Sequence, residues 1–182
     1  MAAAGTISSR RVYTGKVISL DVDQVRFPDG TTGELEMIRH SGASAVVPVL
    51  DAGIPDPDII LIRQYRYAAN AYLYEIPAGR LDPGESPEEC AKRELHEETG
   101  YSVGQVRRLT TIYTTPGFTD EMIHIFVAEG LTGGVANREP DEFMELRAVP
   151  LSRAKAMVHS GEISDAKTAI GLLLVEASRR PK

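Results

Sequence analysis

The stretch from residue 79 to residue 101, GRLDPGESPEECAKRELHEETGY, limits the possible folds of this chain more than any other segment. It predicts a helix over residues 87–99, because Ser86 can act as the N-cap and Glu89 completes an S-x-x-E capping box. Gly100 is expected to end the helix, since glycine readily takes the left-handed conformation of a C-terminal cap. The segment before the helix is rich in glycine and proline, which indicates a loop.

Three carboxylates crowd one side of this predicted helix. At 3.6 residues per turn Glu94 and Glu98 lie on one face and Glu97 lies beside them. Arg93 can offset only part of their mutual repulsion, whereas a divalent cation would offset more, and carboxylate oxygens suit magnesium or manganese. The alternative is a solvated acidic helix, which is common on protein surfaces.

Around this segment the chain alternates between strand-like and helix-like patterns. Residues 1–10 are small and polar and are expected to be loose, and two later helices are expected over 151–159 and 165–179. The second of these is expected to bury one apolar face, made of Ile170, Leu173, Leu174 and Ala177. Strands are expected in short apolar or alternating runs, namely 11–28, 33–40, 45–50, 59–62, 107–114, 122–128 and 143–149. Strands mixed with helices favour a mixed sheet flanked by helices.

Composition excludes several classes of protein. A chain of 182 residues suits one domain, or one domain with an arm, and its net charge of −6 makes a general electrostatic attraction to nucleic acid unexpected. The single cysteine, Cys90, excludes an intramolecular disulfide framework and favours a reducing compartment. No stretch approaches the roughly 20 apolar residues of a membrane span. We therefore expect a soluble, cytoplasmic protein without a membrane or nucleic-acid partner.

The spacing of the segment 79–101 resembles the Nudix box, G-x5-E-x7-R-E-U-x-E-E-x-G-U, where U is aliphatic. The one departure is Tyr101, which stands where an aliphatic residue is usual. The matching residues are Gly79, Glu85, Arg93, Glu94, Leu95, Glu97, Glu98 and Gly100. The Nudix family hydrolyses nucleoside diphosphates linked to another group. The resemblance implies an α/β fold of the Nudix type, an α/β/α sandwich with a mixed β-sheet, over residues 41–182. It also implies that residues 1–40 form a β-hairpin extension used for dimerisation, so a homodimer is expected.

The resemblance also implies roles for the box residues. Two or three Mg²⁺ ions, or Mn²⁺, would be bound by Glu94, Glu97, Glu98 and the main-chain carbonyl of Ala78. Glu97 and Arg93 would serve catalysis, and Arg93 with Glu85 would brace the loop against the helix. Gly79 would let the backbone approach the metal closely, because it has no β-carbon.

Two flanking strings resemble the ADP-ribose and nucleotide-sugar pyrophosphatase branch of the family. They are RQYR at 63–66, followed by E-x-P-A-G at 75–79, and PGFTDE at 116–121. In that branch Glu121 would approach the terminal ribose. The substrate-binding residues implied are Arg63, Arg66, Glu75, Arg80, Pro116, Gly117, Phe118 and Glu121. The alternatives are that the arginines are ordinary surface charges and that 116–117 is simply a turn.

A general base is needed to take a proton from the attacking water. In this branch it usually comes from a late loop, which makes Glu142 the first choice and Glu145 the second; the alternative is a charged loop that enters a strand. His96 is expected to be an exposed helix residue, and His124 a core or sheet-face residue. Neither histidine has partners at zinc-site spacing. Cys90 is expected to be packed rather than reactive.

The sequence thus favours metal-dependent hydrolysis of ADP-ribose to AMP and ribose 5-phosphate. The alternatives are a pyrophosphatase for another nucleoside-diphosphate sugar, such as GDP-mannose or a UDP-sugar, and a regulator that binds ADP-ribose without cleaving it. Such a regulator would be expected to lack box carboxylates, and Glu94, Glu97 and Glu98 are all present.

Overall fold

A computed structural model of the protein describes residues 3–133 and 144–179. The chain folds as two compact units. The N-terminal unit comprises Met1–Gly42 and Tyr113–Met122, and the core unit comprises Ala43–Ile112 and Ile123–Lys182. No helix in the described part of the chain is long and apolar enough to cross a membrane.

The N-terminal unit contains a three-stranded antiparallel sheet of order β1-β2-β3, formed by β1 (Gly5–Thr14), β2 (Ser19–Arg26) and β3 (Thr32–Arg39). Two expectations were wrong here. Residues 5–10 are not loose, because β1 pairs with β2 along its whole length. Residues 11–28 are not one strand, because the chain turns at Gly15, whose N–H donates to the carbonyl of Ile18 at 2.9 Å. Alternation alone does not reveal a tight turn between two strands.

An ionic network ties the three strands of this sheet together. Asp21 and Asp23 are buried, and Arg39 of β3 pairs with both. Hydrogen bonding from Arg11 lowers the pKa of Asp21 first of all, and the bond from Ser9 lowers that of Asp23. Strand pairing therefore brings opposite charges together on a sheet that carries few buried apolar side chains.

The core unit contains two sheets. One has the order β7-β4-β9-β8 and is formed by β4 (Ala43–Pro48), β7 (Ala78–Arg80), β8 (Val106–Tyr113) and β9 (Met122–Ala128). The other has the order β10-β5-β6 and is formed by β5 (Asp58–Arg66), β6 (Ala71–Glu75) and β10 (Met144–Pro150). The strands expected at 33–40, 45–50, 59–62, 107–114, 122–128 and 143–149 are confirmed within a few residues, except that β5 is longer. Strands β6 and β7 were not expected.

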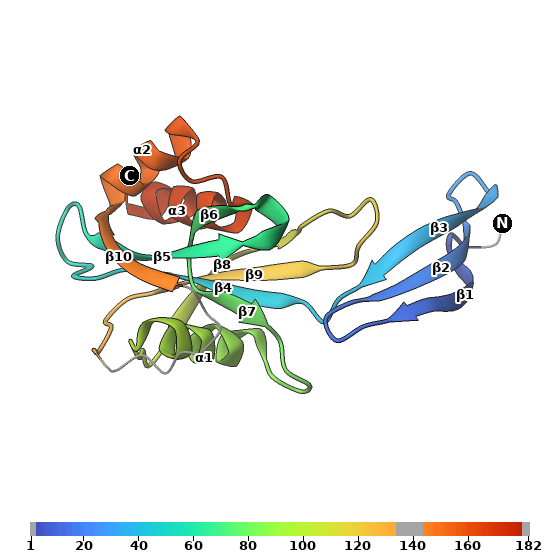
Figure 1. Cartoon of the computed structure of the whole chain (residues 1–182), viewed down its shortest axis with the longest axis horizontal. Coiled ribbons are helices and arrows are strands. Elements are labelled where there is room, and N and C mark those ends of the chain that lie inside the picture. The colour runs from blue at the N-terminus through green and yellow to red at the C-terminus, as the bar shows by residue number, and fades with distance from the viewer. Residues whose placement is uncertain (1–2, 134–143, 180–182) are drawn as a thin grey trace. The chain divides into compact units, whose positions relative to one another are not determined.

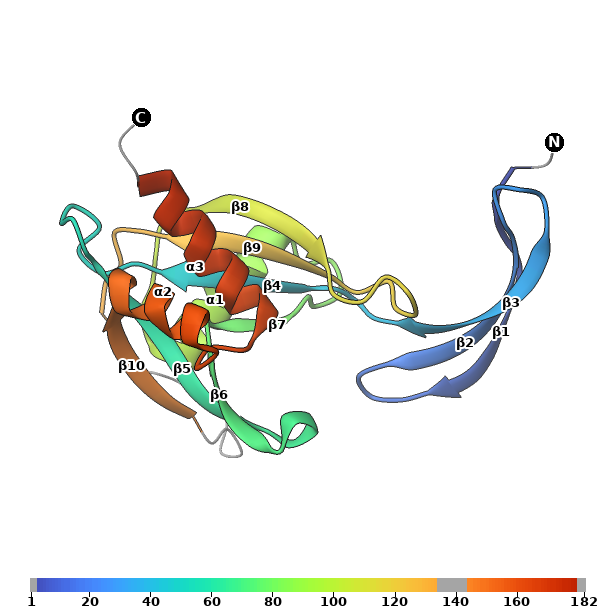
Figure 2. The same ribbon diagram turned by 90° about the horizontal axis from the view of Figure 1, so that it is seen from above.

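The sheet β7-β4-β9-β8 lies between helices, as Figures 1 and 2 show. Strand β4 is parallel to β9 and antiparallel to β7, so the sheet is mixed. Alternate residues of β4 face opposite ways: Val46 packs with Leu95 of α1 (Pro87–Thr99), whereas Val47 packs with Leu172 of α3 (Ala166–Arg179). Helix α2 (Leu151–Ser160) packs on α3 on the same side. The expected α/β/α sandwich with a mixed sheet is confirmed.

The apolar face expected for the last helix was wrong. Helix α3 buries Thr168, Gly171, Leu172 and Val175, whereas Leu173 and Leu174 are exposed. Small residues allow this face of α3 to pack on the sheet, because a β-carbon on Gly171 would stand 2.8 Å from a methyl group of Val47. The backbone of α3 thus lies close to β4, and the hydroxyl of Thr168 accepts a hydrogen bond from the N–H of Ile76. Hydrophobicity alone favours the larger side chains and misses a face selected by close approach.

Candidate active site

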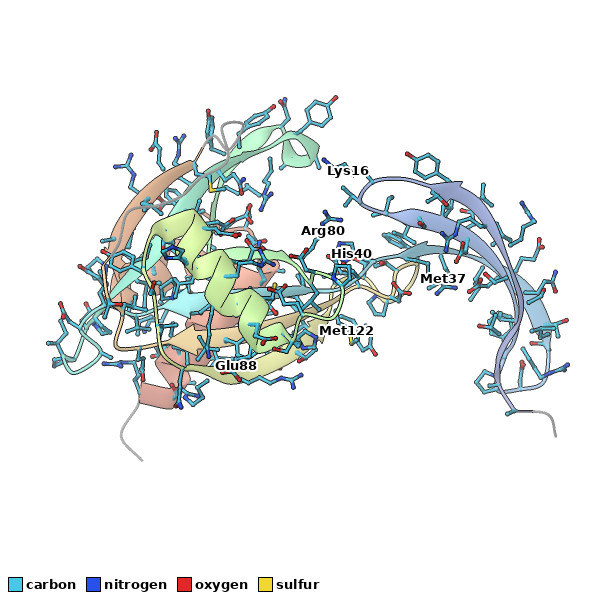
Figure 3. All side chains as sticks on the ribbon, turned by 90° about the horizontal axis from the view of Figure 1, so that it is seen from below. Lys16, Met37, His40, Arg80, Glu88 and Met122 are labelled. Carbon is cyan, nitrogen blue, oxygen red and sulfur yellow. The ribbon has the colours of Figure 1, made fainter. Side chains whose placement is uncertain are left out.

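Helix α1 presents the acidic cluster, and its ends are those that the sequence predicts. The side chain of Ser86 accepts a hydrogen bond from the N–H of Glu89, the reciprocal bond from Ser86 to the Glu89 carboxylate is present, and Gly100 ends the helix at φ 74°. Figure 3 shows Arg80, just after the box glycine, and Glu88 in the first turn of α1. Because both helix ends are fixed by local capping, the carboxylates keep a defined position along the helix.

Arg93 is the hub of this cluster. Its Nε and one Nη donate to the two oxygens of Glu85 at 2.8 and 2.9 Å, a two-point contact that joins the loop to the helix. The bond from Arg93 lowers the pKa of Glu85 to about 2, and the bond to Glu85 is the first cause of the raised pKa of Arg93. A further Nη–H donates to the carbonyl of Arg80 at 3.1 Å. This geometry agrees with the bracing role that the box resemblance implies.

The same guanidinium also holds two of the helix carboxylates. One Nη of Arg93 lies 2.6 Å from an oxygen of Glu94 and 3.0 Å from an oxygen of Glu97. The side chain of Glu94 is 12% exposed, whereas that of Glu97 is 45% exposed. Glu94 lies against Gly79: a β-carbon built on this glycine would stand 1.8 Å from a Glu94 oxygen. The glycine therefore provides the space that the carboxylate fills.

Glu98 lies in the same region and is more deeply buried. It is 7% exposed, and one of its oxygens accepts a hydrogen bond from the N–H of Ala78 at 3.0 Å. This bond joins the last turn of α1 to the strand that leads into the box. The backbone at 78–79 and the carboxylates of Glu94 and Glu98 are thus brought together, as the sequence predicts for a metal centre.

The chemistry of this donor set fits a divalent cation. Glu94, Glu97 and Glu98 supply hard oxygen donors, and the missing β-carbon of Gly79 leaves room for a carboxylate beside the backbone. As the side chains stand, the described residues contain no group of three or more His, Cys, Asp and Glu placed to hold an ion together. The guanidinium of Arg93 supplies the positive charge between Glu94 and Glu97.

The predicted substrate residues Arg66 and Glu75 form an ion pair with each other, in which only Glu75 is buried. The Nε and one Nη of Arg66 donate to the two oxygens of Glu75 at 2.7 and 2.8 Å, and Glu75 is 3% exposed. Lys167 of α3 also reaches Glu75, and it contacts Asp165 at 3.0 Å. Burial works to raise the pKa of Glu75, but the bond from Arg66 and the charge of Lys167 outweigh it, and the pKa is lowered.

Arg63 lies on the neighbouring part of strand β5, in an aromatic setting. Its guanidinium carbon is 4.3 Å from the centre of the Tyr72 ring, and Tyr72 makes an edge contact with Tyr65. Arg63 also lies 3.8 Å from a carboxylate oxygen of Glu145, its partner across the strands β5 and β10. Glu145 in turn contacts Arg147 at 2.7 Å, and its side chain is 52% exposed. The second choice of base therefore lies beside a predicted substrate arginine.

The predicted loop residues Pro116, Gly117, Phe118 and Glu121 belong to the N-terminal unit. Within that unit the segment is fastened to β3: the N–H of Ile38 donates to the carbonyl of Phe118 at 2.8 Å. Glu121 lies 3.5 Å from Nδ1 of His40 and accepts a hydrogen bond from Thr114 at 2.8 Å. Phe118, Glu121, Ile38 and His40 line part of an open pocket of about 340 Å³. His40 was not singled out by the sequence analysis.

Other predicted residues are also located. Glu142, the first choice of base, lies outside the described residues. His96 is exposed, as expected, and His124 contacts Thr111 on the sheet, with a pKa lowered by burial. Cys90 is fully buried, and burial raises the pKa of its thiol to about 12, so the expectation of a packed cysteine is confirmed.

Sequence reasoning missed Tyr72 and the three residues at the start of α3, Asp165, Lys167 and Thr168. One signal was present: Asp165 three residues before Thr168 is a helix-capping pattern, and its carboxylate does accept from the N–H of Thr168 at 3.0 Å. Nothing local connects Lys167 to Glu75, which lies 92 residues earlier in the chain. That contact follows from the packing of α3 against the sheet.

Comparison with known proteins relates this arrangement to a family. A family model described as the NUDIX domain matches residues 40–169. An ADP-ribose pyrophosphatase of Bacillus subtilis (strain 168) is 43% identical over 169 residues, which is 92% of this chain and 89% of that protein. A GDP-mannose pyrophosphatase of Salmonella typhimurium is 41% identical over 162 residues, covering 79% of this chain and 81% of that protein. A crystal structure of an ADP compounds hydrolase covers 98% of this chain and 95% of its own at a TM-score of 0.80, and its 23% identity supports the fold alone.

Proposed function

This chain belongs to the Nudix family, and from that premise we propose that it hydrolyses the pyrophosphate bond of ADP-ribose to give AMP and ribose 5-phosphate. The observation that carries the proposal is the cluster around Arg93, in which the carboxylate of Glu94 fills the space beside Gly79 and Glu98 binds the backbone at Ala78. The name of the Bacillus subtilis relative supports the choice of substrate.

Nudix hydrolases generally need divalent metal ions. We propose Mg²⁺, with Mn²⁺ as a possible replacement, as two or three ions held by Glu94, Glu97, Glu98 and the carbonyl of Ala78. When bound, the metal supplies charge to neutralise the diphosphate and to lower the pKa of the attacking water. Arg93 is held by Glu85 and keeps the loop against the helix, so the carboxylates meet the ions in one fixed arrangement.

The substrate is a dianion, and this protein has a net charge of −6, so local cations must attract it. Arg66 and Arg63 of strand β5 are proposed to contact the diphosphate or the terminal sugar. Arg80, which follows the box glycine, is the third proposed substrate cation. In the structure Glu75 binds Arg66 through both of its oxygens. Arginine suits this task because its guanidinium can hold two phosphate oxygens at once.

The remaining roles are proposed on the resemblance. Glu142 takes the proton from the attacking water, with Glu145 as the second choice. The segment with Pro116, Gly117 and Phe118 forms the substrate loop, and its Glu121 approaches the terminal ribose. The hydrogen bond from Thr114 to Glu121 supports a fixed orientation for that carboxylate.

A second candidate function is hydrolysis of another nucleoside-diphosphate sugar, and the GDP-mannose pyrophosphatase relative at 41% identity favours GDP-mannose among them. The chemistry would be the same, because only the groups that contact the base and sugar would differ. Binding of ADP-ribose without cleavage is disfavoured, since all three box carboxylates are present. We further propose a cytoplasmic homodimer that pairs through residues 1–40, with residues 41–182 as the hydrolase domain.

The direct test is the release of nucleoside monophosphate from ADP-ribose, GDP-mannose, a UDP-sugar, NADH and a dinucleoside polyphosphate, each with Mg²⁺ and with EDTA. A preference for ADP-ribose that disappears with EDTA is expected. A preference for GDP-mannose would keep the metal site and replace the substrate. No metal-dependent turnover of any of these compounds would contradict the proposed function.

A further inference from the structure

Glu75 is held by two cations that differ in their exposure to solvent. Arg66 binds both of its oxygens, and Lys167 binds one of them at 2.5 Å. The side chain of Glu75 is 4% exposed, so its negative charge depends on these partners. Glu75 thus has two cationic partners, and it shares one of them, Lys167, with Asp165.

The two cations differ in how firmly they are held. The side chain of Lys167 is 11% exposed and bridges Glu75 and Asp165, with the contact to Asp165 at 3.0 Å. Asp165 is itself fixed at the start of α3, where it accepts hydrogen bonds from the N–H and the hydroxyl of Thr168. The side chain of Arg66, by contrast, is 42% exposed. Arg66 is therefore the partner of Glu75 that solvent and a ligand can reach more easily, and Lys167 is the more enclosed partner.

Arg66 also interacts electrostatically with one of the proposed metal ligands. The charge of Glu98 contributes to the raised pKa of Arg66, after the hydrogen bond to Glu75, so the two side chains are close enough to interact. Glu75 lies three residues before Ala78, whose N–H binds Glu98. Under the proposed function, a diphosphate bound at the box carboxylates is the group that Arg66 would contact.

We propose that Lys167 is a positioning residue for substrate binding: it holds the buried charge of Glu75 and so allows Arg66 to move from Glu75 to the diphosphate. This deepens the proposed function and rests on it, since that function supplies the diphosphate. Without Lys167, Glu75 keeps Arg66 as its one strong counter-ion, and removing Arg66 would leave a carboxylate buried and unpaired, which is costly. Substrate must then compete with a stronger internal ion pair.

The test compares Lys167→Met, Lys167→Arg and the double variant Glu75→Gln/Lys167→Met. Lys167→Met is expected to raise both KM and the metal-free Kd for ADP-ribose by about tenfold, with kcat changed by less than about threefold, because binding and not chemistry is affected. Lys167→Arg keeps the charge and is expected to remain within about threefold of the wild type. The double variant removes the charge that retains Arg66, and its metal-free Kd is expected to be clearly tighter than that of Lys167→Met alone.

The matched control is Lys155→Met, which breaks another partly buried lysine–glutamate pair, that of Lys155 with Glu176 at 3.3 Å between α2 and α3. It is expected to leave KM and Kd unchanged. A Kd that stays weak in the double variant, or is unaltered in folded Lys167→Met, would overturn the proposal. If Lys167→Met does not fold, the double variant and Lys167→Arg carry the test through their Kd values.

The experiment distinguishes failure of the proposed hydrolysis from failure of the proposed role of Lys167. Wild-type protein that releases no AMP from ADP-ribose would contradict hydrolysis. The metal-free Kd values, measured by isothermal titration calorimetry, require no turnover and still test the role of Lys167. Wild-type protein that hydrolyses ADP-ribose while Lys167→Met binds it normally would retain the function and refute the positioning role.

Discussion

The carboxylate of Glu94 stands where the β-carbon of any other residue at Gly79 would be: a β-carbon built on this glycine lies 1.8 Å from Oε1 and 2.1 Å from the carboxyl carbon of Glu94. These separations are well below van der Waals contact, so one methyl group cannot be accommodated unless the carboxylate moves. The glycine of the box is thus required for the position of a proposed metal ligand and not for an unusual backbone conformation.

Substitution of Gly79 by alanine is therefore expected to displace Glu94 and to reduce turnover about a hundredfold or more, with a stability loss of about 1–3 kcal/mol from overpacking. Turnover at saturating Mg²⁺ and urea denaturation measure the two effects. Gly104→Ala is the control, since nothing lies within 4 Å of its added β-carbon. A variant at Gly79 with wild-type turnover would show that the position of Glu94 does not matter.

Glu98→Gln is expected to lower kcat about a hundredfold or more, because it removes one charge from the proposed metal-binding group while nearly preserving shape. The amide oxygen of glutamine can still accept the bond from the N–H of Ala78, so the fold is expected to remain intact. Steady-state kinetics and circular dichroism measure these outcomes.

Glu88→Gln is the matched control for Glu98→Gln. Glu88 lies on the same helix, is half exposed and pairs with Lys92 one turn away, which is a surface contact of small energetic value. Its kcat is expected to stay near that of the wild type. Unchanged turnover of Glu98→Gln at saturating Mg²⁺ would remove Glu98 from the set of metal ligands.

The ion pair of Glu85 with Arg93 is expected to make the folding stability of the protein depend on pH. In the folded protein the bond from Arg93 lowers the pKa of Glu85 from 4.5 to about 2. A lowered folded-state pKa stabilises the protein above pH 4.5, and this contribution is lost as the pH falls from 4.5 toward 2.

Thermal unfolding of the wild type and Glu85→Gln between pH 7 and pH 2.5 measures this linkage. The difference in Tm is expected to be largest near pH 7 and to shrink steadily below pH 4.5. A difference that is constant over the whole range would mean that the charge of Glu85 contributes nothing to stability. Glu88→Gln again provides a control on the same helix.

The choice of general base is tested by Glu142→Gln and Glu145→Gln. Loss of the base is expected to reduce kcat by roughly 10²–10⁴-fold, and we expect this for Glu142. Glu145 pairs with Arg63 and Arg147, so its substitution is expected to change KM more than kcat. If Glu142→Gln slows turnover only a few-fold and Glu145→Gln abolishes it, then Glu145 is the general base and Glu142 is not.

Local signals were sufficient to predict helix α1 and the positions of its carboxylates along the helix. The capping box of Ser86 and Glu89, the terminal Gly100 and the spacing of Arg93 and the box glutamates all act within a few residues, so the sequence alone determined where the helix begins, where it ends and which side chains share a face. The family resemblance depends on that same short segment.

Only the tertiary structure decided the features that depend on contacts between distant segments. The buried face of α3 follows from the close approach of Gly171 to Val47, which the hydrophobic pattern does not encode. The contact of Lys167 with Glu75 joins residues 92 apart in the chain and exists because α3 packs on the sheet beside β6. Packing of whole elements depends on the shapes of surfaces that are distant in sequence, whereas caps and helix faces are set by neighbours along the chain.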